Sequence, residues 1–574
     1  MSRFNLLDEE WICVLSDEKH TGKEVSLIDF FKNAHLYSCL AGDTKTQDFA
    51  VMRFLLAVLH TVFSRFNADG EEYGYFELDE KFRQTEQIGE DDEERYANDL
   101  MDTWKALWKR GSFPEIVVQY LEKWADRFYL FDEKYPFYQV TKEDISPEKL
   151  SSNPTKTSGK YINRLISQSG NKTALFSPKY GANSNKDKLT ESEIARWLLA
   201  FHAYTGQADK ASFGNVDYNK KSIGWLYNLG GIYFEGNNLY ETLLLNLVLS
   251  HPELKYVKYP QSPCWEFSSS ENIAKLLKQT NVYNISELYT NWSRAIYIDP
   301  EFNTSKPFSF EIVKLPDIMN ENQFLEPMTL WKYNDSGDNK GSFTPRKHRA
   351  NTSVWRSFGL ITLSYDSSKE KGNGNPQKRP VIIDWLSMVS KIIGDYSITL
   401  NSVSMQDDGR PSARLITDEI YDKLNINEML LTDFDIKGWV TRLNETIDET
   451  KYIVDVIYRK FVKDIKDIRN LSSDDFVNRS IQSLYFRIDK PFRDWIEGIK
   501  PTDTKDEKIL EWRDTLRKLV LLHINEFMKN SNPRDFTGTI IKNKKSGNEY
   551  TLNIAIAFNS FMQKFNNKLP KKEV

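Results

Sequence analysis

The 574-residue sequence lacks the features that mark a disulfide framework, a cysteine-based metal site or a membrane span. Its three cysteines, Cys13, Cys39 and Cys264, are odd in number and far apart, which excludes a disulfide framework and a CxxC metal pair. We expect them to pack as small apolar side chains. There is no run of 18 or more apolar residues, and the charged start has no signal-peptide core. The expected location is therefore cytoplasmic, without a membrane partner.

Motifs of the common enzyme classes are missing as well. Seven histidines are present, and none stands at metal-ligand spacing from another histidine or a cysteine. HExxH, GxxxxGKS/T, GxSxG and GxGxxG do not occur. We therefore expect no catalytic residue, no cofactor and no metal. A nuclease that uses scattered carboxylates and Mg²⁺ stays open, with Asp407 and Asp408 as its best candidates, although Asp-Gly and Arg-Pro steps beside them are typical of a solvated turn.

What the chain does have is enough apolar sequence for more than one core. It is 40% hydrophobic and 13% aromatic, and its length exceeds what one core normally organises. Apolar residues at three- and four-residue spacing predict a buried helix over 46–63. Strand-like pieces dominate from 265 to 420, among them 295–298, 308–313, 328–331 and 360–363.

The pattern changes to long amphipathic helices after about Asn425. Four apolar stripes follow, over 439–465, 476–496, 510–527 and 552–565. Such helices can bury their stripes by closing on one another. We therefore predict an α+β protein, with a large mixed α/β N-terminal domain over 1–425 and a C-terminal four-helix bundle over 426–574. Trp439 and Trp495 lie at helical spacing and are expected in the core of the bundle.

The net charge is −5, but the basic and acidic residues are unevenly distributed along the chain. Between 339 and 379 there are nine Lys or Arg against two Asp or Glu, and between 153 and 190 there are seven against one. Local basic stretches attract phosphate even when the whole protein is mildly acidic. On charge alone, each stretch is equally well explained as an ordinary solvated loop.

Both basic stretches also contain aromatic rings. Arg346, Lys347 and Arg349 stand close together, and Trp355-Arg356 follows. In the other stretch, the cluster 175–180 lies within a long Ser/Asn/Lys-rich segment. Cations neutralise phosphates and rings stack on bases, so both stretches are nucleic-acid-binding candidates. A solvated loop and a hydrophobic anchor for that loop are the alternatives.

Short motifs in collinear order give the chain a family resemblance. They are Asn5-Leu6-Leu7 with Trp11-Ile12, Leu40-Ala41-Gly42 with Gln47 and Arg53, Trp124 with Arg127-Phe128, Leu130-Phe131 and Pro136-Phe137-Tyr138-Gln139, Gly230-Gly231 leading to the helix at 241–249, and Ile298-Asp299-Pro300. Together they resemble the CasA family, the large subunits of type I-E CRISPR surveillance complexes (Cascade).

The resemblance implies a function and partners. A CasA-like chain would read a short motif beside the target (the PAM), bind target double-stranded DNA, open the duplex and help recruit a separate helicase-nuclease, without cutting DNA itself. Its partners would be the guide crRNA and the other Cascade subunits, and pairing with the guide would carry most of the sequence specificity. No cysteine-rich stretch follows Asp299-Pro300, so no structural zinc is expected. A metal-dependent nuclease and a purely structural scaffold remain the alternatives.

The resemblance also implies nucleic-acid-binding residues. Phe176 resembles a loop phenylalanine near the 5′ handle of the guide, and Lys179, Lys186 and Lys188 belong to the same loop. Lys332 is similar in placement to a lysine that reaches the minor groove.

The loop at 405–412, with Gln406, Gly409 and Arg410, matches by order the element that reads the motif and separates the strands. Inserting a long side chain at a base step costs a few kcal/mol of unstacking. Because the minor groove offers a degenerate code, such reading should be permissive.

Overall fold

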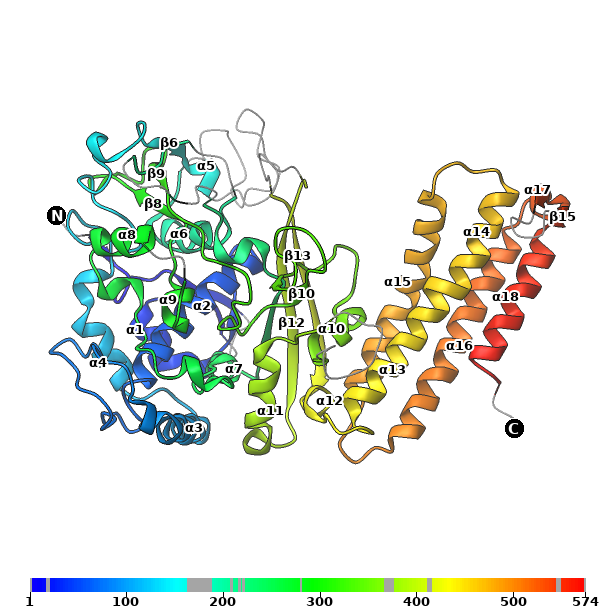
Figure 1. Cartoon of the computed structure of the whole chain (residues 1–574), viewed down its shortest axis with the longest axis horizontal. Coiled ribbons are helices and arrows are strands. Elements are labelled where there is room, and N and C mark those ends of the chain that lie inside the picture. The colour runs from blue at the N-terminus through cyan, green and yellow to red at the C-terminus, as the bar shows by residue number, and fades with distance from the viewer. Residues whose placement is uncertain are drawn as a thin grey trace. The chain divides into compact units, whose positions relative to one another are not determined.

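The computed structural model describes residues 3–16, 21–162, 188–206, 210–214, 218, 222–278, 281–365, 376–409, 416–542 and 549–571. The chain forms two compact units (Figure 1). The first consists of Met1–Ala350, Leu363–Gly394 and Ile398–Lys423, and the second of Asn351–Thr362, Asp395–Ser397 and Leu424–Val574. The second unit therefore includes two short earlier segments that the sequence prediction assigned to the N-terminal domain.

The first unit is built around helix α2, Lys45–Phe63. Thr44 caps this helix by accepting a hydrogen bond from the backbone N–H of Gln47, and every residue from Thr46 onward is buried. Helices α6 (Glu191–Tyr204) and α9 (Ile285–Tyr289) pack against it. The predicted buried helix over 46–63 is confirmed. Among the described residues, α2 is also the single helix long and apolar enough to cross a membrane, yet its whole apolar window is covered by the fold.

Short helices and small sheets surround α2. The other helices of the first unit are α1 (Leu27–Asn33), α3 (Glu93–Arg110), α4 (Ile116–Lys123), α5 (Gly159–Ile162), α7 (Leu239–Asn246), α8 (Ser269–Lys278) and α11 (Val381–Ile393). The sheets, in strand order, are β3-β2-β4 (Thr21–Val25, Ile12–Ser16, Tyr37–Leu40), β6-β9-β8 (Thr155–Ser158, Ser309–Lys314, Arg294–Tyr297) and β1-β5 (Arg3–Asn5, Tyr129–Phe131). The strands predicted at 295–298 and 308–313 are confirmed.

The strand predicted at 360–363 is wrong. Phe358–Thr362 forms the short helix α10, which belongs to the second unit and packs against helix α13 (Trp439–Tyr452). Phe358, Ile361 and Thr362 are buried there, and Thr362 Oγ1 accepts a hydrogen bond of 3.0 Å from Asn444 Nδ2. A short apolar run looks alike in a buried strand and in a buried helix, so only the tertiary contacts decide between them.

The described part of the second unit contains four long helical segments that run side by side (Figure 1). The first is α13 continued by a π-helical turn (Ile453–Tyr458) and α14 (Arg459–Ile468), and the others are α15 (Asp475–Glu497), α16 (Lys505–Lys529) and α18 (Ile554–Lys568). Shorter elements are α12 (Met429–Thr432), α17 (Pro533–Thr537) and the hairpin β14–β15 (Thr539–Lys542, Glu549–Leu552). The four predicted stripes correspond to these helices, and Trp439 and Trp495 are buried as expected.

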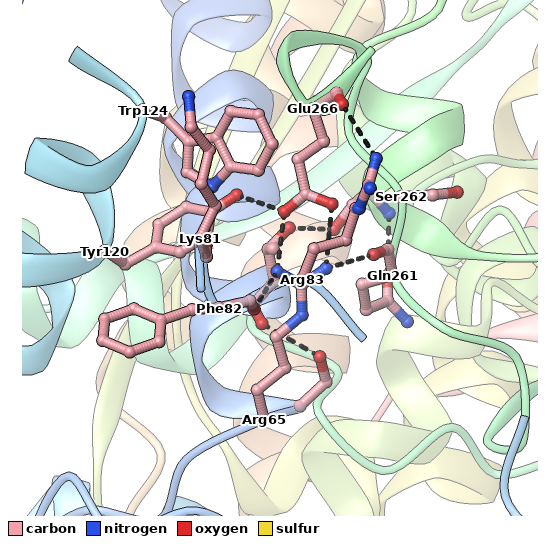
Figure 2. A network of polar contacts seen from close by, with 12 residues as sticks. Arg65, Lys81, Phe82, Arg83, Tyr120, Trp124, Gln261, Ser262 and Glu266 are labelled. Carbon is pink, nitrogen blue, oxygen red and sulfur yellow. Dashed lines mark hydrogen bonds and ion pairs between the residues drawn. The ribbon is translucent and has the colours of Figure 1, made fainter. Parts of the chain in front are cut away.

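A buried ion pair fixes remote segments of the first unit to the end of α2 (Figure 2). The Arg65 guanidinium and the Glu266 carboxylate form two hydrogen bonds, of 2.6 and 3.0 Å, and the Tyr120 hydroxyl donates to the same carboxylate at 2.6 Å. Arg65 also donates to the carbonyls of Phe82 and Gln261. These bonds satisfy most of the remaining donors and acceptors, as a buried charge pair requires, and Arg65 Nε is left without a partner among the described residues.

Candidate nucleic-acid interface

The hairpin β10–β11 (Trp331–Tyr333, Phe343–Pro345) carries several of the predicted cations. In its antiparallel register Lys332 lies opposite Thr344, so Lys332 is close to the point where the chain continues into residues 346–349. Lys332 and Arg349 are exposed, whereas Arg346 and Lys347 are partly buried. The structure therefore joins Lys332 to the basic run that the sequence predicted separately.

Hydrogen bonds and close contacts with Gly230 and Gly231 position the basic run 346–349. The carbonyl of Gly230 accepts from the Leu330 N–H at 3.0 Å, and the Leu330 carbonyl accepts from the Arg346 N–H at 2.9 Å. His348 Nε2 hydrogen-bonds the Gly231 carbonyl at 2.9 Å. A Cβ atom at position 230 would lie 2.2 Å from the Arg346 carbonyl oxygen, so only glycine allows this close approach.

A second buried ion pair attaches the segment before β10 to α2. Glu326 accepts from both Nη atoms of Arg53, at 2.8 and 2.6 Å, and from Trp225 Nε1 at 2.6 Å. The Met328 N–H donates to the same carboxylate at 3.0 Å. Because Met328 lies just before β10, the core helix holds the base of this hairpin in place.

The sheet β13-β12-β7 (Ile416–Asn427, Ser397–Asp407, Gly231–Glu235) contributes the second hairpin. On β13, the Glu419 carboxylate accepts from the backbone N–H groups of Lys45 and Thr46, at 3.2 and 2.7 Å. These are the first residues of α2, where unpaired N–H groups and the helix dipole favour a negative charge. The β12–β13 hairpin is therefore held by the same helix as β10–β11.

An ion pair connects the basic run to the end of β12. Lys347 Nζ lies 2.7 Å from Asp407 Oδ2 and 4.0 Å from the centre of the Tyr227 ring. The Tyr227 hydroxyl and the Gly409 N–H also donate to Asp407, at 3.1 and 2.9 Å. Burial by itself would raise the pKa of Asp407, but the hydrogen bond from Lys347 and that from the Gly409 N–H outweigh it and lower the pKa. We call Lys332, Arg346, Lys347, Arg349, Asp407 and Gly409 the hairpin cluster.

Comparison with known proteins identifies the family. The family described as CRISPR-associated protein Cse1 matches residues 5–522. The chain belongs to this Cse1 family. A relative from Thermus thermophilus, described as CRISPR-associated protein CasA/Cse1, is 29% identical over 269 residues, which is 46% of this chain and 42% of that relative. The predicted resemblance to CasA is confirmed.

Solved structures share the Cse1 fold over nearly the whole chain. Thermobifida fusca Cse1 superposes with a TM-score of 0.74 at 22% identity, covering 99% of this chain and 98% of that one. Acidimicrobium ferrooxidans Cse1 gives 0.68 at 17% identity with the same coverage. A chain of a CRISPR RNA-guided surveillance complex gives 0.57 at 13% identity, covering 92% of this chain and all of that one. The predicted α+β fold class is confirmed.

Some of the residues predicted to bind nucleic acid in this Cse1 family member lie in the hairpin cluster, and the others are placed as follows. Gln406 is partly buried near the end of β12, and its carbonyl accepts from Thr417 Oγ1 at 3.3 Å. Gly409 is exposed with φ +71°, as a turn at the Asp-Gly step requires. Arg410 lies outside the described residues, and so do Phe176, Lys179 and Lys186. Lys188 is partly buried just before the Thr190 cap of α6, and the contacts of the described residues do not join it to either hairpin.

Trp355 and Arg356 belong to the second unit. Trp355 is completely buried in the second unit, where its ring stacks on Phe492 at 4.3 Å. The candidate metal pair is also disfavoured, because Asp407 is engaged by the Lys347 ammonium group. The described residues contain no group of three or more His, Cys, Asp or Glu placed to hold a metal ion.

Sequence reasoning missed the residues that position the cluster. Tyr227 and Glu419 lie far from the basic run in the chain, Glu326 lies 20 positions before Arg346, and none of the three belongs to a motif. Arg53 was noted as part of a family motif, but its partner Glu326 is 273 residues away. A local sequence pattern carries no signal for such pairings.

Proposed function

We propose that this chain is the large subunit of an RNA-guided surveillance complex and uses the hairpin cluster to bind target DNA beside the guide-paired region. Its partners are the guide crRNA, the other Cascade subunits and target double-stranded DNA. Membership of the Cse1 family supports the assignment, and so does the fold shared with a chain of an RNA-guided surveillance complex. The contact between Lys347 and Asp407 is the observation that carries the proposal, because it brings the cations and the end of β12 together.

Arg346 and Arg349 supply the anion-binding part of the cluster. Among the described residues, neither guanidinium has a carboxylate within 4 Å. Burial and the positive charge of Arg349 lower the pKa of Arg346, so the two cations are close enough to repel each other. A phosphate group would relieve this repulsion, as in other clusters of uncompensated arginines. Lys347 is not counted with these two arginines, because the Asp407 carboxylate already neutralises its positive charge.

We assign recognition of the DNA motif beside the target (the PAM) to the end of the β12–β13 hairpin. Gln406, which is partly buried, and Arg410, which lies outside the described residues, are the two candidates for the side chain that enters the duplex. Unstacking one base step costs a few kcal/mol, which phosphate contacts from the hairpin cluster would offset. Opening the duplex beside the PAM would then allow guide pairing, and the loaded complex would recruit a separate helicase-nuclease.

Reconstitution of the complex tests this function. The chain is assembled with the other subunits and guide crRNA, and target duplexes that differ only in the flanking motif are titrated. We expect motif-dependent binding, and we expect Lys332→Gln to weaken target DNA binding while guide RNA is retained. Arg95→Gln, at a 76% exposed side chain on α3, is the matched control and should have no effect. Binding that ignores the flanking motif would contradict the proposal.

The chain itself is not expected to cut DNA. Incubating the purified protein with plasmid and Mg²⁺ or Mn²⁺ should leave the plasmid intact. Cutting that disappears in the Asp407→Asn, Asp408→Asn double variant would establish the nuclease alternative instead.

A further inference from the structure

The second unit has an open groove of its own, with a volume of about 610 Å³. One side is the outer face of α15, and the other is the segment that contains Asn351, Ser353 and Arg356. A volume of several hundred Å³ is enough for a nucleotide-sized ligand. All residues that line this groove belong to the second unit.

The groove has two cations and one neutralised acid. The Arg356 guanidinium lies 3.5 Å from the centre of the Tyr485 ring, which holds it in place. Among the described residues, neither Arg356 nor Arg479 has a carboxylate within 4 Å. Asp489 accepts hydrogen bonds from Ser353, from Trp355 Nε1 at 2.8 Å and from Arg493 Nε at 2.7 Å. The groove therefore presents net positive charge to a ligand.

An aromatic ring stands beside these cations. The Phe486 side chain is 84% exposed. The exposed positions of α15 from 478 to 490 include no carboxylate, and they are Asn478, Arg479, Gln482, Ser483, Phe486 and Lys490. A single ring among polar side chains offers too little apolar surface for a stable protein interface, whose core is mostly apolar. The same ring can stack on a base, because every base has a π-face.

We propose that this groove binds single-stranded nucleic acid. Arg356 and Arg479 contact successive phosphates, and Phe486 stacks on a base. The serine, asparagine and glutamine side chains of the groove are additional hydrogen-bonding groups for phosphate or sugar. The residues of this site all belong to the second unit, and the proposal does not depend on the function assigned to the hairpin cluster.

Fluorescence anisotropy with a labelled oligothymidylate tests the site on the full-length protein. Phe486→Ala should weaken binding about tenfold, within the range for loss of one stacked base, and should leave the salt dependence unchanged. Arg479→Gln should instead reduce the slope of log K against log salt by about 0.7, the value for one phosphate contact on a single strand. Phe486→Tyr should keep the affinity, since it keeps a ring.

Control variants and probes distinguish this site from others. Phe536→Ala, at a 63% exposed phenylalanine on α17, should bind like the parent protein. Lys332→Gln probes the hairpin cluster, so its effect reports on that surface and not on the groove. Ultraviolet cross-linking of the oligothymidylate should label the α15 peptide that contains Phe486. Unchanged affinity in Phe486→Ala would overturn the proposal, and so would displacement of the oligonucleotide by polyglutamate at equal concentration, which would indicate an acidic protein partner.

Discussion

Lys347 Nζ and Asp407 Oδ2 lie 2.7 Å apart, although the two residues are separated by 60 positions in the sequence. This ion pair joins the basic run after β11 to the end of β12, and Tyr227 contacts both partners. Glu326 and Glu419 connect the same two hairpins to α2. The core helix therefore determines where the exposed cations lie.

Lys347→Met tests whether this ion pair positions the hairpins. Both side chains are only about one-fifth exposed, at 22% and 23%, so loss of the Lys347 partner should lower the free energy of unfolding by about 1–3 kcal/mol. Target DNA binding by the assembled complex should fall several-fold, because the end of β12 loses its fixed place beside Arg346. Denaturant unfolding and DNA titration give the two values.

Lys105→Met, which removes a 47% exposed lysine on α3, is the control for that substitution and should change neither value. The ion pair also has a defined pH dependence. Since the folded state lowers the pKa of Asp407, its stabilising contribution is present above the ordinary aspartate value of 3.8 and is lost as the pH falls through the lower, folded value. A large loss of stability in Lys347→Met would show that the pair is structural and not positional.

Gly230→Ala should displace the basic run. The added Cβ would meet the Arg346 carbonyl oxygen at 2.2 Å, so the backbone must shift, at a cost of about 1–3 kcal/mol. Target DNA binding should weaken with it. Gly74→Ala has no atom within 4 Å of the new Cβ and should leave both stability and binding unchanged. A fully stable Gly230→Ala variant would contradict the observed close approach.

Glu266→Gln should destabilise the first unit strongly. The substitution leaves the buried Arg65 guanidinium without its counter-charge, and breaking such a pair costs about 3–5 kcal/mol. The comparison is Asp126→Asn, which removes an exposed partner of Lys81 and should cost less than about 1 kcal/mol. Equal losses in urea unfolding would mean that Arg65 is not buried as described.

Buried histidines should make stability depend on pH. Burial lowers the pKa of His348 to about 4, from 6.5 in the unfolded chain. The unfolded state therefore binds more protons between these values, and stability falls as the pH falls from 6.5 towards 4. His348→Gln should remove up to about 1.4 kcal/mol per pH unit from this slope. An unchanged slope would show that His348 is solvated in the folded protein.

Periodicity predicted the helices better than the strands. Apolar residues recur at helical spacing over several turns in 46–63 and in the second unit, so these helices could be inferred directly, although Leu510 and Ile556 of the predicted stripes are exposed. The apolar residues at 360–363 are too few for a period to be read, and they form part of helix α10. The Asp-Gly turn at Gly409 was predictable because its conformation depends on local chemistry.

The candidate site was only partly predictable. Charge and spacing identified Arg346, Lys347 and Arg349, but Trp355 looked equally suitable and is a core residue of the second unit. Lys332 could be proposed from the sequence only through the family resemblance. The register of β10 and β11 shows that it lies beside the basic run. The boundary after Asn425 and the roles of Gln406 and Arg410 stay predictions.

The salt dependence of target DNA binding tests the central claim most directly. In the assembled complex, the Arg346→Gln, Arg349→Gln double variant should bind target duplex more weakly. The slope of log K against log salt should fall by about 1.8, which is about 0.9 for each lost phosphate contact. An unchanged slope with unchanged affinity would show that these two cations do not contact DNA and would contradict the account.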